Sequence, residues 1–283
     1  MRPGARGSGE GRARPDLPRP PVIPALRAAT AGRVGVTMEW HDTGIVLATR
    51  KHGERALVVH ALTRAHGRHA GLVRNGQSAR QRGSYVIGNR LDLTWRARLA
   101  EHLGTFRAEL ENSHAAAFID DGPRLAALAA AAAVAQATLP EHEPHPRAWR
   151  GILELIAALE SDRGWAERYV RWEFDLLAEL GFGLDLASCV ATGRNDNLIY
   201  VSPRSGQAVS ASAGEPYRDK LLALPQFLLG EARPSAAEIA AGLVLTGFFL
   251  AHRVLEPQGG RLPAARMRFV DAIRRRPTMN GLV

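Results

Sequence analysis

The spacing of apolar residues changes once along this 283-residue chain, and the change limits the folds it can adopt. Between residues 44 and 111, apolar and polar side chains alternate, most regularly over 91–95 and 106–110. A period of two places successive side chains on opposite faces of a β-strand. Farther along, apolar residues recur at steps of three and four, which is the period of an amphipathic helix. The sequence therefore predicts an α+β protein, with a β-rich domain at 38–115 and an α-helical domain at 116–283.

The β-rich domain reads as a small barrel. It contains five short β-prone segments in fewer than eighty residues, and no long helical pattern interrupts them. Glycine-containing turns such as His52-Gly53-Glu54 and Asn75-Gly76 separate the segments. We expect the strands at 45–50, 57–63, 72–75, 90–96 and 106–111.

A helix predicted over 165–180 forms the centre of the second domain. Its apolar side chains lie three and four residues apart and place two tryptophans and a tyrosine on one buried face. On another face, Glu167, Arg171 and Asp175 recur at every fourth position, so that face meets solvent or a partner. Gly181 ends the helix, because a residue without Cβ adopts the left-handed conformation easily. The predicted buried positions are Trp165, Tyr169, Trp172, Leu176 and Leu180.

Other helices are marked by their ends. Asp120-Asp-Gly-Pro123 starts one helix, with proline at an early position. Ser235 and Glu238 form a capping box that opens another. Short helices are expected at 216–224 and 226–229. The proline-rich segment 140–146 reads as a solvated linker, although its histidines and glutamates also allowed a metal site.

Residues 187–212 predict a small knuckle or hairpin, in which turn residues flank one short β-prone segment. Cys189 is the only cysteine of the chain. A structural zinc site requires four thiolate or imidazole ligands, so we predict no metal and no cofactor. Packing and hydrogen bonds must hold the knuckle together.

The net charge of +9 is unevenly distributed. The β-rich domain has twelve basic and seven acidic residues, whereas the helical domain is nearly neutral. A basic domain points to a polyanionic partner, and we interpret the barrel as a single-stranded nucleic-acid binder. The alternative is that its arginines form the solvated face of a half-buried sheet. The predicted phosphate contacts are Arg68, Arg74, Arg80, Arg82, Arg90 and Arg96.

Only Tyr85, Trp95 and Phe106 offer aromatic rings for base stacking, and the last two lie on the apolar side of their strands. We therefore expect binding without sequence readout. The chain contains no P-loop, no His-Glu-x-x-His, no Gly-x-Ser-x-Gly and no dinucleotide fingerprint. The sequence therefore gives no motif that indicates an enzyme.

No apolar segment is expected to reach the roughly 20 residues of a membrane span. The single cysteine fits a reducing cytoplasm.

The segments RWEFDLLAELGFGLDLASC, YVSPRSG and GRLPAARMRF resemble the RecO family of bacterial recombination mediators. The resemblance covers residues 38–283 and implies an OB-fold barrel followed by a helical domain. Many members of that family bind zinc through four cysteines in the knuckle. In this chain Thr192 stands where a second cysteine of a Cys-x-x-Cys pair is expected, which agrees with a knuckle without zinc.

The resemblance implies a cytoplasmic, nucleoid-associated, non-enzymatic protein of DNA repair and recombination. It implies binding and annealing of single-stranded DNA, contact with double-stranded DNA, and loading of RecA together with RecR. RecA is loaded onto DNA that is coated by single-stranded DNA-binding protein. We expect the acidic tail of this coating protein to occupy an apolar groove beside Arg168 and Arg171. The alternative is that Arg171 only pairs with Glu167 and Asp175.

Two other readings stay open at this point. One is an RNA-binding OB-fold protein of translation or RNA processing, and the other is a nuclease, against which the scattered carboxylates argue. Residues 1–37 are rich in Arg, Pro and Gly. They read either as a disordered basic extension or as the product of a mis-called start that precedes Met38.

Overall fold

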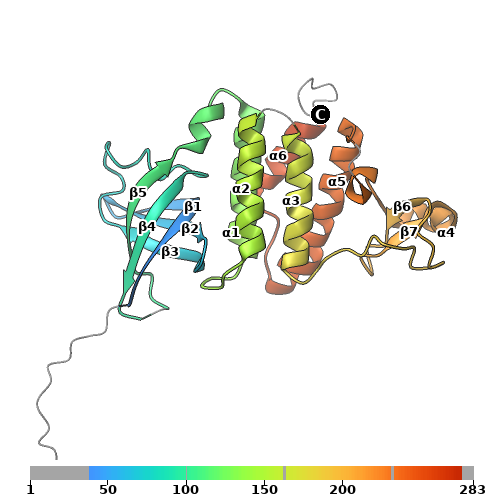
Figure 1. Ribbon diagram of the computed structural model, residues 1–283, viewed down its shortest axis with the longest axis horizontal. Helices are drawn as coiled ribbons and strands as arrows, with labels where there is room; N and C mark the ends of the chain where they lie inside the picture. The colour runs from blue at the N-terminus through green and yellow to red at the C-terminus, as the bar shows by residue number, and fades with distance from the viewer. Residues whose placement is uncertain (1–37, 100, 162–163, 231–232, 276–283) are drawn as a thin grey trace, which may run out of the picture. The chain divides into compact units, whose positions relative to one another are not determined.

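The computed structural model describes residues 38–99, 101–161, 164–230 and 233–275, so the predicted extension at 1–37 lies outside them. Its first part is a β-sheet that closes on itself, followed by helices, and the α+β prediction is confirmed (Figure 1). Neighbouring strands run antiparallel, except that β3 and β5 meet in one parallel pair. The barrel order is β1-β2-β3-β5-β4, with β1 (Met38–His52), β2 (Ala56–Thr63), β3 (Gly67–Val73), β4 (Arg90–Ala97) and β5 (Thr105–Asn112).

The barrel interior is filled by side chains from the alternating apolar positions. Trp95 and Phe106 face each other across the β4–β5 pair and are 1% and 4% exposed, which confirms that they belong to the core. The Trp95 indole donates a hydrogen bond to the carbonyl of Ala70 at 3.2 Å. Two predicted strand positions were wrong, since β1 starts at Met38 rather than at 45 and β3 covers 67–73 rather than 72–75.

Five helices form most of the second part, and a short 3-10 helix, η1 (His114–Phe118), leads into it. Helix α2 packs on α3, α1 packs on α6, and α3 packs on α5. The predicted buried face of α3 is confirmed from Trp165 to Leu176, whereas Leu180 is only partly buried. The capping box at Ser235 and Glu238 is also confirmed. The helices are α1 (Gly122–Thr138), α2 (Pro146–Ser161), α3 (Trp165–Glu179), α5 (Ala236–Phe249) and α6 (Ala264–Arg274).

Helix α1 joins the helical core to the barrel. Its buried residues are mostly alanines, which permit close approach of neighbouring elements. Ile45, Leu47 and Leu62 of the barrel belong to the same apolar cluster as these alanines. The barrel therefore packs on α1 through the outward side of β1 and β2.

A buried ion pair links three helices of the second part. Arg266 of α6 donates two hydrogen bonds of 2.7 Å to the carboxylate of Glu173 on α3, and both side chains are almost fully buried. Thr246 of α5 donates a third, at 2.6 Å. Gly247 makes room for the guanidinium, because a Cβ there would lie 2.6 Å from an Arg266 nitrogen. Every charge in this cluster has a partner, as a buried pair requires.

Within the predicted knuckle, β6 (Leu198–Val201) pairs with β7 (Ala208–Ser210). Strand β8 (Leu222–Ala223), which lies beyond the predicted bounds, completes a three-stranded sheet in the order β7-β6-β8. The short helix expected at 216–224 is confirmed only as far as residue 220, and residues 222–223 form a strand. Helix α4 (Ala211–Gly214) and the 3-10 helix η2 (Glu215–Lys220) precede β8. A further short helix, η3 (Gln226–Leu229), matches the prediction at 226–229.

The segment 140–146 was expected to be a solvated linker, and most of its residues are exposed, but the segment also docks on the barrel. The His142 ring lies 2.8 Å from the ring of His69 on β3. Gly67 has φ +70°, and a Cβ there would lie 1.9 Å from the Glu143 carbonyl oxygen. Only glycine fits so close an approach. The segment therefore fixes the barrel against the helices.

One continuous helical stretch, residues 236–258, is long and apolar enough by length and composition to cross a membrane. This corrects the expectation that no apolar segment reaches that length. Of its most apolar window, 56% is buried inside the protein. Helix α5 contributes Ile239, Leu243 and Phe249 to the core, so core packing accounts for its composition.

Candidate nucleic-acid interface

The turn between β1 and β2 lies beside the long segment 74–89 that connects β3 to β4. The Gln77 side chain donates hydrogen bonds to the carbonyls of Gly53 and Ala56, at 3.1 and 2.8 Å. The backbone N–H of Gln77 also bonds to the Arg55 carbonyl at 3.1 Å. These bonds hold the two segments together at one end of the barrel, and we call this end the loop end.

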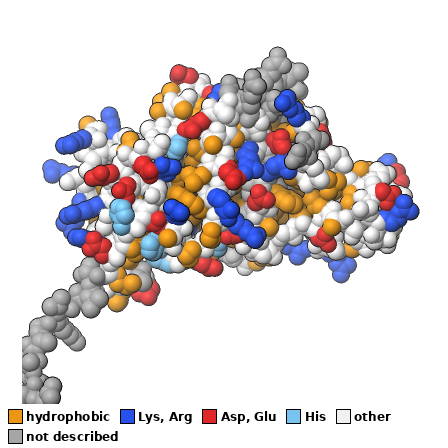
Figure 2. Space-filling view, in the orientation of Figure 1, with side chains coloured by type: hydrophobic (Ala, Val, Ile, Leu, Met, Phe, Trp, Pro, Cys, Tyr) orange, Lys and Arg blue, Asp and Glu red, His pale blue; other side chains and the backbone are white. Residues whose placement is uncertain are grey.

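The loop end is strongly basic. It carries six exposed cationic side chains, and in the part of the chain that the structure describes none of them makes an ion pair. Figure 2 shows Lys and Arg side chains gathered over the barrel. Such uncompensated charge attracts phosphate groups and releases counterions when it binds them. The six residues are Arg50, Lys51, Arg55, Arg74, Arg80 and Arg82.

A groove of about 470 Å³ opens next to the loop end, between β3 and β5. Arg74, Arg96 and Arg107 line it, and Gln81 and Tyr85 of the connecting segment form another part of its wall. Arginines that converge on a polar groove suit a phosphodiester backbone, because each guanidinium can donate two hydrogen bonds to one phosphate. The groove and the loop end share Arg74 and together form the candidate interface.

Three of the predicted phosphate contacts have acidic partners within the protein. Arg96 makes two bonds of 2.8 Å to Glu39 on the neighbouring strand β1. Arg90 pairs with Glu111 on β5. Exposed pairs of this kind contribute little to stability, but the carboxylate cancels the local charge.

Arg68 is held still more firmly. Its guanidinium donates to the Leu139 carbonyl at 2.8 Å and to Glu141 at 2.8 Å, and its side chain is 14% exposed. These partners tie β3 to the segment after α1 and leave little capacity for a phosphate. We therefore do not include Arg68 in the candidate interface.

The aromatic rings of the barrel offer few free faces for base stacking. Tyr85 is 5% exposed, and burial raises the pKa of its hydroxyl. Trp40, which the sequence analysis did not single out, lies between the rings of His66 and Trp95, with centroid distances of 4.2 and 5.5 Å. Both faces of Trp40 are thus occupied. The interface offers cations and few base platforms, which favours binding without sequence preference.

Comparison with known proteins agrees with this architecture. A family model described as Recombination protein O N terminal matches residues 38–114, and one described as Recombination protein O C terminal matches residues 119–261. The DNA repair protein RecO of Rhodospirillum centenum is 54% identical over 247 residues, which cover 87% of this chain and 98% of that protein. The chain belongs to the RecO family of DNA repair proteins.

Two further RecO proteins show the same extent of similarity. The protein of Rhodospirillum rubrum is 49% identical, over 84% of this chain and 97% of its own length. The protein of Mesorhizobium japonicum is 47% identical, over 84% of this chain and 94% of its own length. The RecO resemblance stated from the sequence is confirmed, and with it the assignment to DNA repair and recombination.

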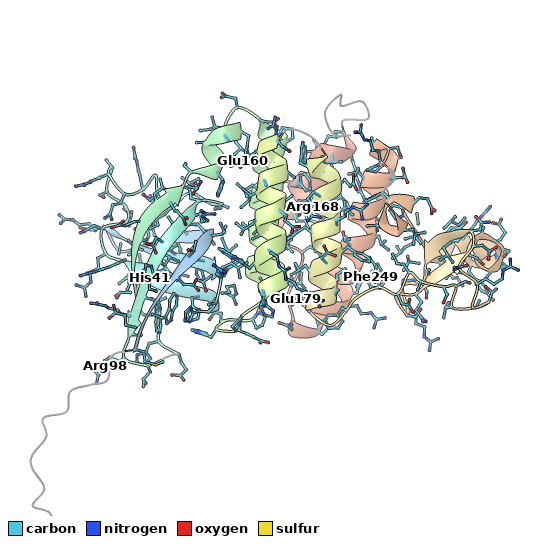
Figure 3. The ribbon with its side chains drawn as sticks, in the orientation of Figure 1. His41, Arg98, Glu160, Arg168, Glu179 and Phe249 are labelled. Carbon is cyan, nitrogen blue, oxygen red and sulfur yellow. The ribbon has the colours of Figure 1, made fainter. Side chains whose placement is uncertain are left out.

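The arginines predicted to bind a partner lie on α3 of this RecO-family chain, and Figure 3 labels Arg168. Arg168 pairs with Glu154 of α2. Arg171 pairs with Glu167 at 2.8 Å and donates to the carbonyls of Phe227 and Gly230. It also lies over the Phe227 ring, 5.4 Å from the centroid. Arg171 thus holds η3 against α3, and partner binding at these residues stays a prediction.

The knuckle contains one reactive group, the Cys189 thiol. Burial raises its pKa, but hydrogen bonds from Ser210 and Thr192 outweigh burial and lower it to about 6. The Ser210 N–H lies 3.3 Å from the sulfur. Among the residues that the structure describes, no three His, Cys, Asp or Glu side chains are grouped so that they could hold a metal ion. The sulfur acts here as an acceptor that fixes the knuckle.

The sequence analysis missed Arg50, Lys51 and Arg55 of the loop end. These residues flank a turn that also contains Glu54, so the segment read as an ordinary solvated turn. One signal was available, because the turn between the first two strands of an OB-fold is a common nucleic-acid-binding loop. The structure adds the hydrogen bonds that bring this turn beside Arg74, Arg80 and Arg82.

Proposed function

We propose that the chain binds single-stranded DNA through the loop end of its barrel and acts as a recombination mediator. The observation that carries the proposal is the set of six exposed cations at one end of the barrel, none of which pairs with an acidic residue that the structure describes. Family membership supports a role in DNA repair. Among the polyanions of DNA repair, single-stranded DNA suits this surface best, because a basic groove and turn can follow its phosphate backbone.

The mechanism is electrostatic. Arg74, Arg80 and Arg82 contact phosphates, and the groove beside them directs the backbone along β3 and β5. Because the aromatic rings are buried or stacked on one another, base identity contributes little. Neutralising the phosphates of two strands reduces their mutual repulsion, and this promotes annealing of complementary strands.

The partners follow from the RecO family rather than from a site seen here. We infer that the chain works with RecR to load RecA onto DNA coated by single-stranded DNA-binding protein. We also infer that it does so in the cytoplasm and without catalysis of its own. The acidic tail of the coating protein would lie beside Arg168 and Arg171, where two arginines border the α3 surface. Replacement of Arg171 by Glu should abolish binding of a tail peptide if this assignment holds.

A binding experiment tests the proposed function. The variant Arg74→Glu/Arg80→Glu/Arg82→Glu should bind a fluorescent oligothymidylate at least roughly ten-fold more weakly than the parent at about 0.1 M salt. The matched control is Arg261→Glu/Arg268→Glu, which changes exposed arginines far along the sequence. Equal affinity of parent and triple variant contradicts the proposal. Competition by RNA that exceeds competition by DNA would instead favour an RNA-binding role.

A further inference from the structure

A second basic site lies between the barrel and helix α2, in a cleft of about 640 Å³ that we call the junction cleft. Arg64, Arg90 and Glu111 line it from the barrel. Trp149, Arg150 and Leu153 line it from α2. The cleft thus carries three guanidinium groups and one carboxylate.

The charges of the junction cleft are only partly compensated. Glu111 pairs with Arg90, whereas Arg64 and Arg150 are exposed and make no ion pair with any residue that the structure describes. The Nε atom of Arg90 is also buried without a hydrogen-bond partner. Two free positive charges and one unused donor form a site for an anion.

The Arg64 side of the cleft is rigidly built. The Arg64 N–H donates to the Thr43 carbonyl at 3.0 Å, and the Ala65 N–H donates to the Asp42 carboxylate at 2.8 Å. Asp42 is further occupied by the ring of His66 at 2.9 Å. Asp42 therefore fixes the turn, and its charge is directed to groups other than the Arg64 guanidinium. On the other side, Arg150 is fixed to a helix whose Trp149 is buried.

The junction cleft is separate from the loop end. Thr43 and Lys51 lie eight residues apart on β1, which corresponds to roughly 25 Å along an extended strand. Between these two residues the strand is covered, because residues 44–47 are buried. The two basic sites are therefore not one continuous surface along β1.

We propose that the junction cleft is a second phosphate-binding site, which holds a single-stranded DNA backbone beyond the segment bound at the loop end. This inference rests on the proposed function. A polyanion with a charge at every nucleotide can reach both sites at once, whereas a short acidic peptide has no such link to the loop end. The buried ring of Trp149 offers no stacking face, so the cleft binds phosphates rather than bases.

Strand length separates the two sites experimentally. An oligothymidylate of about 8 nucleotides fills one site, and one of roughly 30 nucleotides exceeds the footprint of a single OB-fold. The variant Arg64→Glu/Arg150→Glu should bind the short probe like the parent. It should bind the long probe about ten-fold more weakly, with a shallower dependence on salt.

Two control variants test whether the loss of affinity depends on the positive charge and on its position in the cleft. Arg64→Lys/Arg150→Lys keeps the charge and should retain most of the affinity for the long probe. Arg261→Glu/Arg268→Glu makes the same charge change elsewhere and should affect neither probe. Unchanged circular dichroism confirms that the variants are folded.

Several results would overturn the inference. One is unchanged affinity of the cleft variant for the long probe. Another is an equal loss for both probes, since the cleft would then be part of a single site. A third is cleft-dependent binding of an oligo-aspartate peptide with no effect on DNA, which assigns the cleft to an acidic protein. If the parent binds neither DNA probe, the proposed function itself fails.

Discussion

The arginines of the barrel strands and those of its turns have the same chemistry but different surroundings. On the strands, Arg90 and Arg96 lie opposite carboxylates of neighbouring strands and pair with them. In the turns at the loop end, Arg74, Arg80 and Arg82 have no acidic neighbour of this kind among the described residues. A sheet surface brings charges of opposite sign into register, whereas a turn projects them into solvent. The comparison shows that position, more than residue type, decides which arginine is free for a phosphate.

A third arginine, Arg266, is buried together with its partner Glu173, in contrast to the exposed arginines of the strands and turns. We expect Arg266→Met to lower the free energy of unfolding by about 3–5 kcal/mol, because it leaves the Glu173 carboxylate buried without its partner. Urea denaturation measures this. Arg266→Met/Glu173→Gln should recover much of the loss, since no buried charge remains. A loss below about 1 kcal/mol for the single variant would mean that the pair is accessible to water.

The loop end should show the opposite behaviour, with a large effect on binding and a small one on stability. The variant Arg50→Glu/Lys51→Glu/Arg55→Glu should reduce affinity for a short oligothymidylate by roughly 10- to 100-fold. Its free energy of unfolding should change by no more than about 0.5 kcal/mol. Fluorescence anisotropy and urea denaturation measure the two quantities. Retained affinity would restrict the interface to the segment 74–89.

His69 is a base that burial keeps uncharged. Burial, and then the neighbouring His142, lower its pKa from 6.5 to about 4. As pH falls through 6.5, the unfolded chain takes up this proton before the folded protein does. Stability should therefore decrease between about pH 6.5 and 4, by on the order of 2 kcal/mol. His69→Gln should show a flatter pH dependence of urea midpoints, and an unchanged slope would assign the effect to other groups.

The smallest expected effect concerns the paired arginines themselves. Glu39→Gln removes the carboxylate that Arg96 binds and frees its guanidinium beside the groove. Affinity for the short oligothymidylate should rise about two- to three-fold, because one further positive charge faces the backbone. Stability should change by less than about 1 kcal/mol. A fall in affinity would show that Glu39 positions Arg96 for the phosphate rather than competing with it.

Much of the fold was predictable because its periods are local. The alternation at 91–95 and 106–110 and the aromatic face of α3 each depend on neighbours a few residues away. The errors arose where tertiary pairing overrides a local pattern. Residues 222–223 read as the end of a helix, but they pair with β6 and form a strand.

The candidate site was less predictable for the same reason. Whether Arg96 is free depends on Glu39, which lies 57 residues away and meets it only through the register of β1 and β4. The docking of segment 140–145 likewise depends on Gly67, and the local sequence does not predict that its φ is +70°. Charge localisation points to the barrel as the domain of a basic interface, which stays a prediction, but it does not show which barrel arginines pair with carboxylates.

The most direct test of the account compares two double variants with equal charge change. Arg74→Gln/Arg82→Gln removes two turn arginines, and Arg90→Gln/Arg96→Gln removes two paired strand arginines. The slope of log affinity against log salt should become shallower by about 1.4 for the turn variant with a short single strand, at about 0.7 per phosphate contact. It should change by less than about 0.5 for the strand variant. Equal changes in both variants, or a larger change in the strand variant, would contradict the account.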